Sequence, residues 1–341
     1  MEIVASWPAS SPLSGVAAWA QRAEALGFDV MHVPETIHDP FTVAALALAS
    51  TERIVVRTSM VVAFARSPMV TAYTAWDLAR FSGGRFQLGL ASQVRGNIVA
   101  RFSAEWSEPV ARLREYVQAV RAIFDSFQHG TELGFHGEHY RFDRLQPYFN
   151  PGPLDVKSPP IWTGGVNRRM CELAGEVSDG FVCHPTNSHP EVLRASILPA
   201  MDAGQARSGR TDRPRVVAGP QPITAATHAE LADVRDARRS ELAFLYSTPA
   251  YKQQLELFGL GDLGDTLSDM ARRSDWDRLE QHLTDDVIGR LVPQATHDAL
   301  PDLLADWYGG LCDGIVLALP DDLDDVAALE LVRRCRDVPG R

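Results

Sequence analysis

The sequence predicts an α/β protein, a (β/α)8 TIM barrel that carries a long helical insertion before its last strand. Short apolar runs alternate with amphipathic stretches along the whole chain, which is the pattern of repeated strand–helix units. Eight such runs can be counted, and eight units favour a barrel over a doubly wound sheet. Most of the runs are continuously apolar, as expected for parallel strands that are buried on both faces.

The predicted strands and helices alternate in regular order. Strands are expected at residues 2–6, 28–33, 54–62, 85–90, 161–163, 180–183, 216–223 and 314–319. Helices are expected at residues 12–26, from about 41, from about 68, from about 107, at 167–177 and from about 323. The helix from about 107 has apolar residues at spacings of three and four, which mark one buried face: Val110, Leu113, Val117, Val120, Phe124 and Phe127. A hairpin or flap is expected at residues 134–142.

We expect a single domain over residues 1–341, in which residues 225–313 form a mostly helical insertion in the seventh unit. An insertion of this size above a barrel is often a lid or a wall of the substrate site. Tyr246 lies within it and is a candidate substrate contact. The alternative is that its leucines only pack the insertion onto the barrel.

Composition excludes several classes of function. The net charge of −11 argues against nucleic acid and anionic membranes as partners. No apolar run is long enough to span a bilayer, and no signal peptide is evident, so a cytoplasmic protein is expected. The four cysteines are scattered without the spacing of metal ligands, and no metal site is expected.

In a barrel, function collects in the loops that follow the strands. The loop after the second strand contains Glu35, Thr36, His38 and Asp39, which suggest acid–base or ring-binding groups. The alternative is a capped loop in which Asp39 begins the next helix. Arg66 follows the third strand; it is a candidate substrate contact, or a partner that pairs with Glu35 and shapes the loop.

Three further loops contain candidate binding residues. After the fourth strand, Ser92 and Gln93 are suited to hydrogen bonds with a polar heterocycle and Arg95 to a substrate anion, unless this loop is simply solvated. After the fifth strand, the run Gly164, Gly165, Val166 and Asn167 leads straight into a helix, whose free N–H groups favour a phosphate. His184, after the sixth strand, is a second phosphate donor or a structural histidine.

Three segments carry a family resemblance. AEALGFDVMHVPET, DLARFSGGRFQLGLAS and IWTGGVNRRMCELAGEVSDGFVCHP resemble signatures of the bacterial-luciferase-like monooxygenase superfamily. QVRGNIVARFSAEWSEPVARLREYVQAVRAIF is similar to the branch that uses the deazaflavin coenzyme F420. The resemblance implies a TIM barrel with a tricyclic ring at its mouth, and a homodimer. Its site residues would be Glu35 and Thr36 near the ring, a non-proline cis peptide at Ser59–Met60 behind it, Ser92 and Gln93 as ring contacts, and a phosphate at residues 164–167 beside His184.

The first functional hypothesis is therefore a coenzyme F420-dependent oxidoreductase that transfers a hydride to or from a small organic substrate, with secondary metabolism as one setting. Glu35 or His38 would move the accompanying proton. The alternative is an FMN-dependent monooxygenase that uses FMNH2 and O2, with a flavin reductase as its partner. A third hypothesis, a non-catalytic ligand-binding barrel, rests on Ala91 and Arg57, which replace glycines common in the family.

Overall fold

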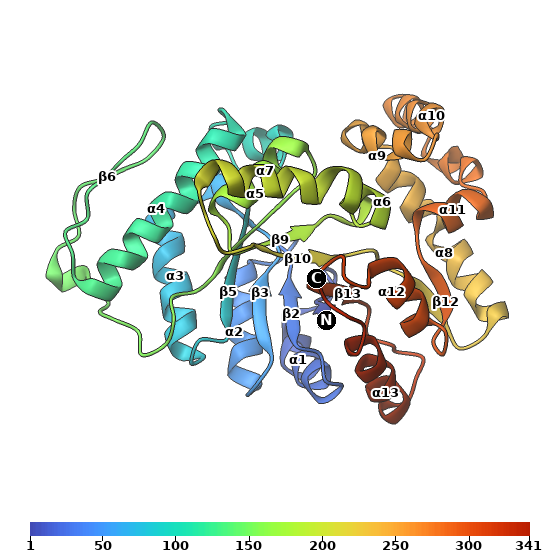
Figure 1. The fold of residues 1–341 in the computed structure, drawn as a ribbon, viewed down its shortest axis with the longest axis horizontal. Helices are drawn as coiled ribbons and strands as arrows, with labels where there is room; N and C mark the ends of the chain where they lie inside the picture. The colour runs from blue at the N-terminus through green and yellow to red at the C-terminus, as the bar shows by residue number, and fades with distance from the viewer.

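The protein forms a closed barrel of parallel strands in the computed structural model, which describes residues 1–341 with every side chain except that of residue 250 (Figure 1). The strand Glu2–Ser6 pairs with both Val30–Val33 and Gly314–Leu317, and the strand Val55–Thr58 pairs with Phe86–Ala91, so the sheet closes on itself. The predicted barrel is thereby confirmed. Its strands are β1 (Glu2–Ser6), β2 (Val30–Val33), β3 (Val55–Thr58), β4 (Val61–Val62), β5 (Phe86–Ala91), β8 (Ile161–Gly165), β9 (Gly180–Cys183), β10 (Arg215–Ala218) and β13 (Gly314–Leu317).

Helices return the chain from the end of one strand to the start of the next and cover the outside of the barrel. Two of them begin where the sequence places a capping residue before a proline, since Asp39 accepts from the Thr42 N–H and Ser67 from the Met69 N–H. The covering helices are α1 (Val16–Ala25), α2 (Pro40–Ser50), α3 (Pro68–Phe81), α4 (Pro109–His129), α5 (Arg168–Val177), α6 (Pro190–Val192), α7 (Leu198–Ser208), α12 (Leu300–Tyr308) and α13 (Asp325–Arg336).

The interior of the barrel holds a buried charge. The Arg57 side chain is 0% exposed and lies over the Trp162 ring, 3.5 Å from its centroid. Its guanidinium donates to Glu2 Oε1 at 2.9 Å and to Gln87 Oε1 at 2.7 Å, and lies 3.1 Å from His32 Nε2. Burial lowers the pKa of Arg57 to about 10, so the group stays protonated at neutral pH. The position where the family commonly has glycine is thus filled by a fully paired side chain.

The predicted insertion is more varied than expected. Its segments are β11 (Ile223–Ala225), α8 (His228–Tyr246), α9 (Lys252–Leu257), α10 (Gly261–Arg272), α11 (Asp285–Leu291) and β12 (Gln294–Thr296). The two strands pair in parallel outside the barrel, and the buried apolar residues of this part form a cluster of their own. α12 lies inside the expected range but packs on the main core through Leu300, Leu304 and Tyr308. The insertion stands to one side of the barrel in Figure 1.

Three expected elements are interrupted or begin differently from the prediction. The strand expected at 216–223 is two strands, because Pro220 and Pro222 lack the N–H groups that a ladder needs. The strand expected at 54–62 is interrupted at the Ser59–Met60 peptide. The helix expected from residue 12 begins as a short 3-10 turn, and α1 starts only at Val16.

The hairpin expected at residues 134–142 is confirmed by the antiparallel strands β6 (Phe135–His136) and β7 (Arg141–Phe142). It stands beside α4, on the side of the barrel away from the insertion (Figure 1). None of the described helices is long and apolar enough to cross a bilayer. The single-domain organisation stays a prediction.

Candidate active site

The loops with candidate residues open on one end of the barrel, because all its strands run parallel and these loops follow their carboxyl ends. Inward-facing positions near this end carry small residues. Trp162 faces inward in β8, so Gly164, two residues later, does the same. A Cβ added at Gly164 would lie 3.2 Å from Met60 Cγ, and one at Gly89 only 1.9 Å from the Thr58 carbonyl oxygen. The two glycines therefore allow the Thr58 backbone and the Met60 side chain to approach the neighbouring strands closely.

Glu35 is held by an ion pair. Both its oxygens lie 2.9 Å from Arg66 Nη1, and its Oε2 also accepts from the Val62 N–H at 2.7 Å. The Glu35 side chain is only 6% exposed, and Arg66 pairs with Asp39 as well. The carboxylate is thus already satisfied by the protein, which favours the alternative in which Glu35 shapes the loop. The same contacts occupy Arg66, so its role as a substrate contact has no support from this geometry.

His38 is oriented by one hydrogen bond. Its Nε2 lies 3.0 Å from the Ser11 carbonyl oxygen. Because a carbonyl only accepts, Nε2 carries a hydrogen, which leaves Nδ1 as the nitrogen that can accept a proton. The neighbouring Thr36 is exposed, and its carbonyl accepts a hydrogen bond from Arg101, a residue that sequence reasoning did not single out.

The Ser59–Met60 peptide is cis, as the resemblance implied. The Met60 side chain lies against two strands, close to the backbone of Gly89 and of Gly164. It packs on the apolar cluster that fills the barrel interior. Met60 therefore forms part of the floor of the mouth, where the resemblance places the back of the ring.

The loop after β5 is a local turn. Gln93 has a φ of 63° and accepts from the Val94 N–H through its side chain at 2.9 Å, while Ser92 Oγ donates to the Gln93 carbonyl at 3.2 Å. Arg95 is exposed and makes no ion pair with the described residues. Arg95 is thus available to an anion, whereas Ser92 and Gln93 now hydrogen-bond within their own loop.

The loop after β8 presents unpaired donors. Asn167 caps α5 by accepting from the Met170 N–H at 3.0 Å. Among the described residues, the backbone N–H groups of Val166 and Asn167 donate to no protein atom. Both precede a ten-residue helix, whose dipole also favours negative charge at this end. The loop has the donor set of a phosphate site.

His184 lies next to this loop, because β8 and β9 are neighbours. Its Nδ1 accepts from the Thr186 N–H at 3.4 Å, so Nε2 carries the ring hydrogen, and Nε2 lies 3.3 Å from the Tyr251 hydroxyl. The His184 and Tyr251 rings stack with centroids 4.9 Å apart. Burial lowers the pKa of His184 to about 4, so the ring is neutral at neutral pH, with its Nε2–H beside the Tyr251 hydroxyl.

The insertion reaches this site through residues other than the expected one. Tyr246 is buried in the insertion's own cluster, and burial raises its pKa. Two insertion residues hydrogen-bond the loop after β9: Tyr251 lies against His184, and Gln254 contacts Asn187. Asn187 stands in the polar run after a predicted strand and Tyr251 in the predicted insertion, whereas nothing in the sequence marked Gln254.

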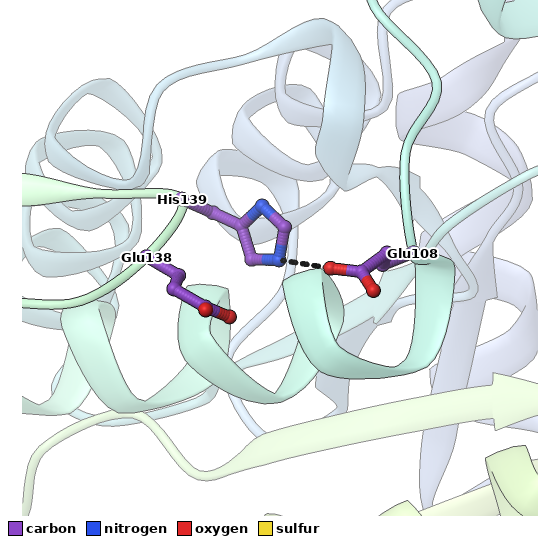
Figure 2. Close-up of side chains that lie close together, drawn as sticks. All are labelled: Glu108, Glu138 and His139. Carbon is purple, nitrogen blue, oxygen red and sulfur yellow. Dashed lines mark ion pairs between the residues drawn. The ribbon is translucent and has the colours of Figure 1, made fainter.

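A second polar cluster lies away from these loops, where the hairpin meets the start of α4 (Figure 2). Glu108, Glu138 and His139 bring their ligand atoms within 4.8 Å of one another, and His139 Nε2 is 3.8 Å from Glu108 Oε2. Glu115 accepts from the backbone N–H groups of Glu138 and His139. These contacts fasten the hairpin tip to α4.

Comparison with known proteins bears on both fold and site. The sequence model of the family described as luciferase-like monooxygenase matches residues 3–314. The chain belongs to this family. Family membership confirms the resemblance of the three segments and identifies the chain as an oxidoreductase.

Two sequence relatives of this luciferase-like protein are informative. An uncharacterized protein of Mycobacterium tuberculosis is 38% identical over 299 residues, which is 87% of each chain. The F420-dependent glucose-6-phosphate dehydrogenase of Intrasporangium calvum is 31% identical over 206 residues, covering 56% of this chain and 59% of the relative.

Two solved structures share the luciferase-like fold. The coenzyme F420 dependent tetrahydromethanopterin reductase of Methanopyrus kandleri superposes with a TM-score of 0.74, at 18% identity, covering 97% of this chain and 96% of the other. The oxygenating constituent of 3,6-diketocamphane monooxygenase of Pseudomonas putida, in complex with FMN, gives 0.72 at 17% identity, with 100% and 99% covered.

The depressed pKa of His184 predicts how stability depends on pH in this luciferase-like protein. Between the ordinary value of 6.5 and about 4, the unfolded chain binds more protons than the folded one, so stability falls as the pH falls through this window. The free energy of unfolding should fall between about pH 7 and pH 5, and we expect this fall to be smaller in His184→Gln than in the wild type by on the order of 1–2 kcal/mol. Urea unfolding at both pH values measures this. The exposed His129 serves as the control, as His129→Gln, and parallel losses in wild type and His184→Gln would refute the assignment.

Proposed function

We propose that the chain is a coenzyme F420-dependent oxidoreductase that transfers a hydride to or from a small organic substrate. The observation that carries the proposal is the pair of unpaired N–H groups at Val166 and Asn167, next to the neutral His184. The sequence likeness to an F420-dependent dehydrogenase supports the choice of cofactor. When bound, a deazaflavin supplies two-electron hydride chemistry.

The residues at the mouth fit a planar cofactor with a phosphate. A side chain at Gly164 would press on Met60, and Met60 gives the mouth an apolar floor. Gly165, Val166, Asn167 and His184 would hold the phosphate by N–H donation alone, without a cation. Thr36, Ser59, Ser92 and Gln93 would line the ring, the last two after exchanging their present hydrogen bonds for contacts with it.

For the proton that accompanies the hydride, we favour His38 over Glu35. Nδ1 of His38 is an acceptor, and the Ser11 carbonyl holds the ring in place through Nε2. Glu35 acts as a positioning residue through Arg66 and the Val62 N–H. Arg95 would meet an anionic group of the substrate, while Arg66 and Tyr246 are held elsewhere.

The FMN-dependent monooxygenase remains the second candidate, supplied with FMNH2 by a flavin reductase. A phosphate site of this kind serves FMN equally well, and the fold is shared with an FMN-bound monooxygenase. The hypothesis of a non-catalytic barrel rested on Ala91 and Arg57. Arg57 no longer supports it, because the hydrogen bonds of Arg57 all stay within the barrel interior. A homodimer and a cytoplasmic location stay predictions.

A charge placed at the cap of α5 tests the phosphate site. Aspartate and serine both cap helices well, so Asn167→Asp and Asn167→Ser should keep α5 folded. The aspartate would repel the phosphate, and we expect it to weaken F420 binding at least about tenfold relative to the serine variant. Fluorescence quenching of F420 measures both affinities. Equal affinities would contradict the placement, and tighter wild-type binding of FMN than of F420 would favour the second candidate.

The proton-transfer assignment is tested by a pair of variants. With the best substrate from a panel of alcohols and activated alkenes, His38→Gln should lower turnover by roughly 10²–10⁴ and leave cofactor affinity nearly unchanged. Glu35→Gln should mainly lower the free energy of unfolding, by on the order of 1–3 kcal/mol, because Arg66 and the Val62 N–H lose a charged partner. The reverse pattern would return Glu35 to the catalytic role.

A further inference from the structure

We infer that the insertion is part of the phosphate site: Gln254, acting through Asn187, is a positioning residue that fixes the loop after β8. The inference rests on the proposed function, because it concerns the same phosphate. It assigns to α9, a helix of the insertion, a role that goes beyond covering the barrel. The inference does not depend on whether the insertion also forms a wall of the substrate site.

A chain of two side-chain hydrogen bonds connects α9 with the loop. Gln254 Nε2 donates to Asn187 Oδ1 at 2.7 Å, and Asn187 Nδ2 donates to the Val166 carbonyl at 2.9 Å. Both amide side chains are buried, and Asn187 is 0% exposed. The contact joins residues that are 67 positions apart in the sequence.

The Val166 carbonyl fixes the donor and the acceptor in both of these hydrogen bonds. The Val166 carbonyl can only accept, so the Asn187 amide must turn its NH2 group toward it and its oxygen toward Gln254. Gln254 then has to present its own NH2 group. Its Oε1 is buried and has no partner among the described residues, so the bond to Asn187 is its one protein hydrogen bond. The bond to Asn187 is therefore the hydrogen bond that the buried Gln254 amide group makes to the protein.

The consequence for the phosphate site follows from the planar peptide. The C=O of Val166 and the N–H of Asn167 belong to one trans peptide unit and point in opposite directions. When Asn187 holds the carbonyl on one side, the N–H is turned to the other side. The donor expected to meet the phosphate is thus oriented before any ligand arrives, which lowers the cost of ordering it on binding.

A second contact of the same segment supports the inference. Tyr251, which immediately precedes α9, stacks on His184 and lies within hydrogen-bond distance of its Nε2. One short stretch of the insertion therefore reaches both groups that would bind the phosphate. Because coupling between sites is reciprocal, a bound phosphate should in turn stabilise the docked position of α9.

The test compares two glutamines on one helix. Gln254→Leu removes the positioning bond at nearly constant volume, and Gln253→Leu makes the same change at the exposed neighbour. Each variant is titrated by fluorescence with F420 and with the deazaflavin riboside that lacks the phosphate. In the wild type, the phosphate should tighten binding. We expect Gln254→Leu to reduce that advantage about tenfold, with the affinity for the phosphate-free ligand unchanged, and Gln253→Leu to keep it.

Three results would separate the possible failures. If the wild type binds F420 and Gln254→Leu keeps the full phosphate advantage, the inference is overturned and the proposed function stands. If Gln254→Leu weakens both ligands equally, the residue has only a general structural role, which also overturns the inference. If the wild type binds neither ligand, the proposed function fails first. Gln254→Asn, whose shorter side chain cannot reach Asn187, replaces the leucine variant if that one does not fold.

Discussion

A guanidinium at the axis of a barrel, away from water, has to be paired and hydrogen-bonded, because an isolated buried charge costs several kcal/mol or more. Arg57 meets this condition with Glu2, Gln87 and the face of Trp162. These partners come from strands β1, β5 and β8, so the charge can be satisfied only when the barrel is closed. Large side chains fill the interior at this level. Above it, glycine at 89 and 164 lets the Thr58 backbone and the Met60 side chain approach these strands closely.

That closed barrel decides which loops meet. Parallel neighbours β8 and β9 bring the free N–H groups before α5 next to His184, and burial keeps this histidine neutral. The same closure places the insertion, which follows β10, beside the loop after β9. Gln254 and Tyr251 then reach donors that belong to the barrel. The proposed anion site is thus made from three separate stretches of chain, and it contains amide and imidazole donors rather than a cation.

Much of this fold could be predicted from the sequence, but few of its tertiary contacts could. Continuous apolar runs identified the barrel strands, and the step from Gly164 and Gly165 into a helix identified the loop with free N–H groups. The break after β10 was readable too, since Pro220 and Pro222 cannot continue a ladder, but the apolar residues around them suggested one strand. Contacts across the insertion were beyond reach: nothing in local pattern distinguishes Gln254 from Gln253, or Tyr251 from Tyr246. The sequence allowed Glu35 to be a proton-transfer group or a partner of Arg66, and only the tertiary structure shows the ion pair.

One phosphate-bearing cofactor is proposed to bind across the loop after β8 and the insertion. Amide hydrogen exchange of the wild type with and without F420 tests this binding, because it locates the protected N–H groups without any substrate. We expect slower exchange at residues 165–167 and at residues 251–257, with no change in the hairpin at 134–142. Saturated F420 binding that leaves the amides of 165–167 exchanging at their original rate would contradict it.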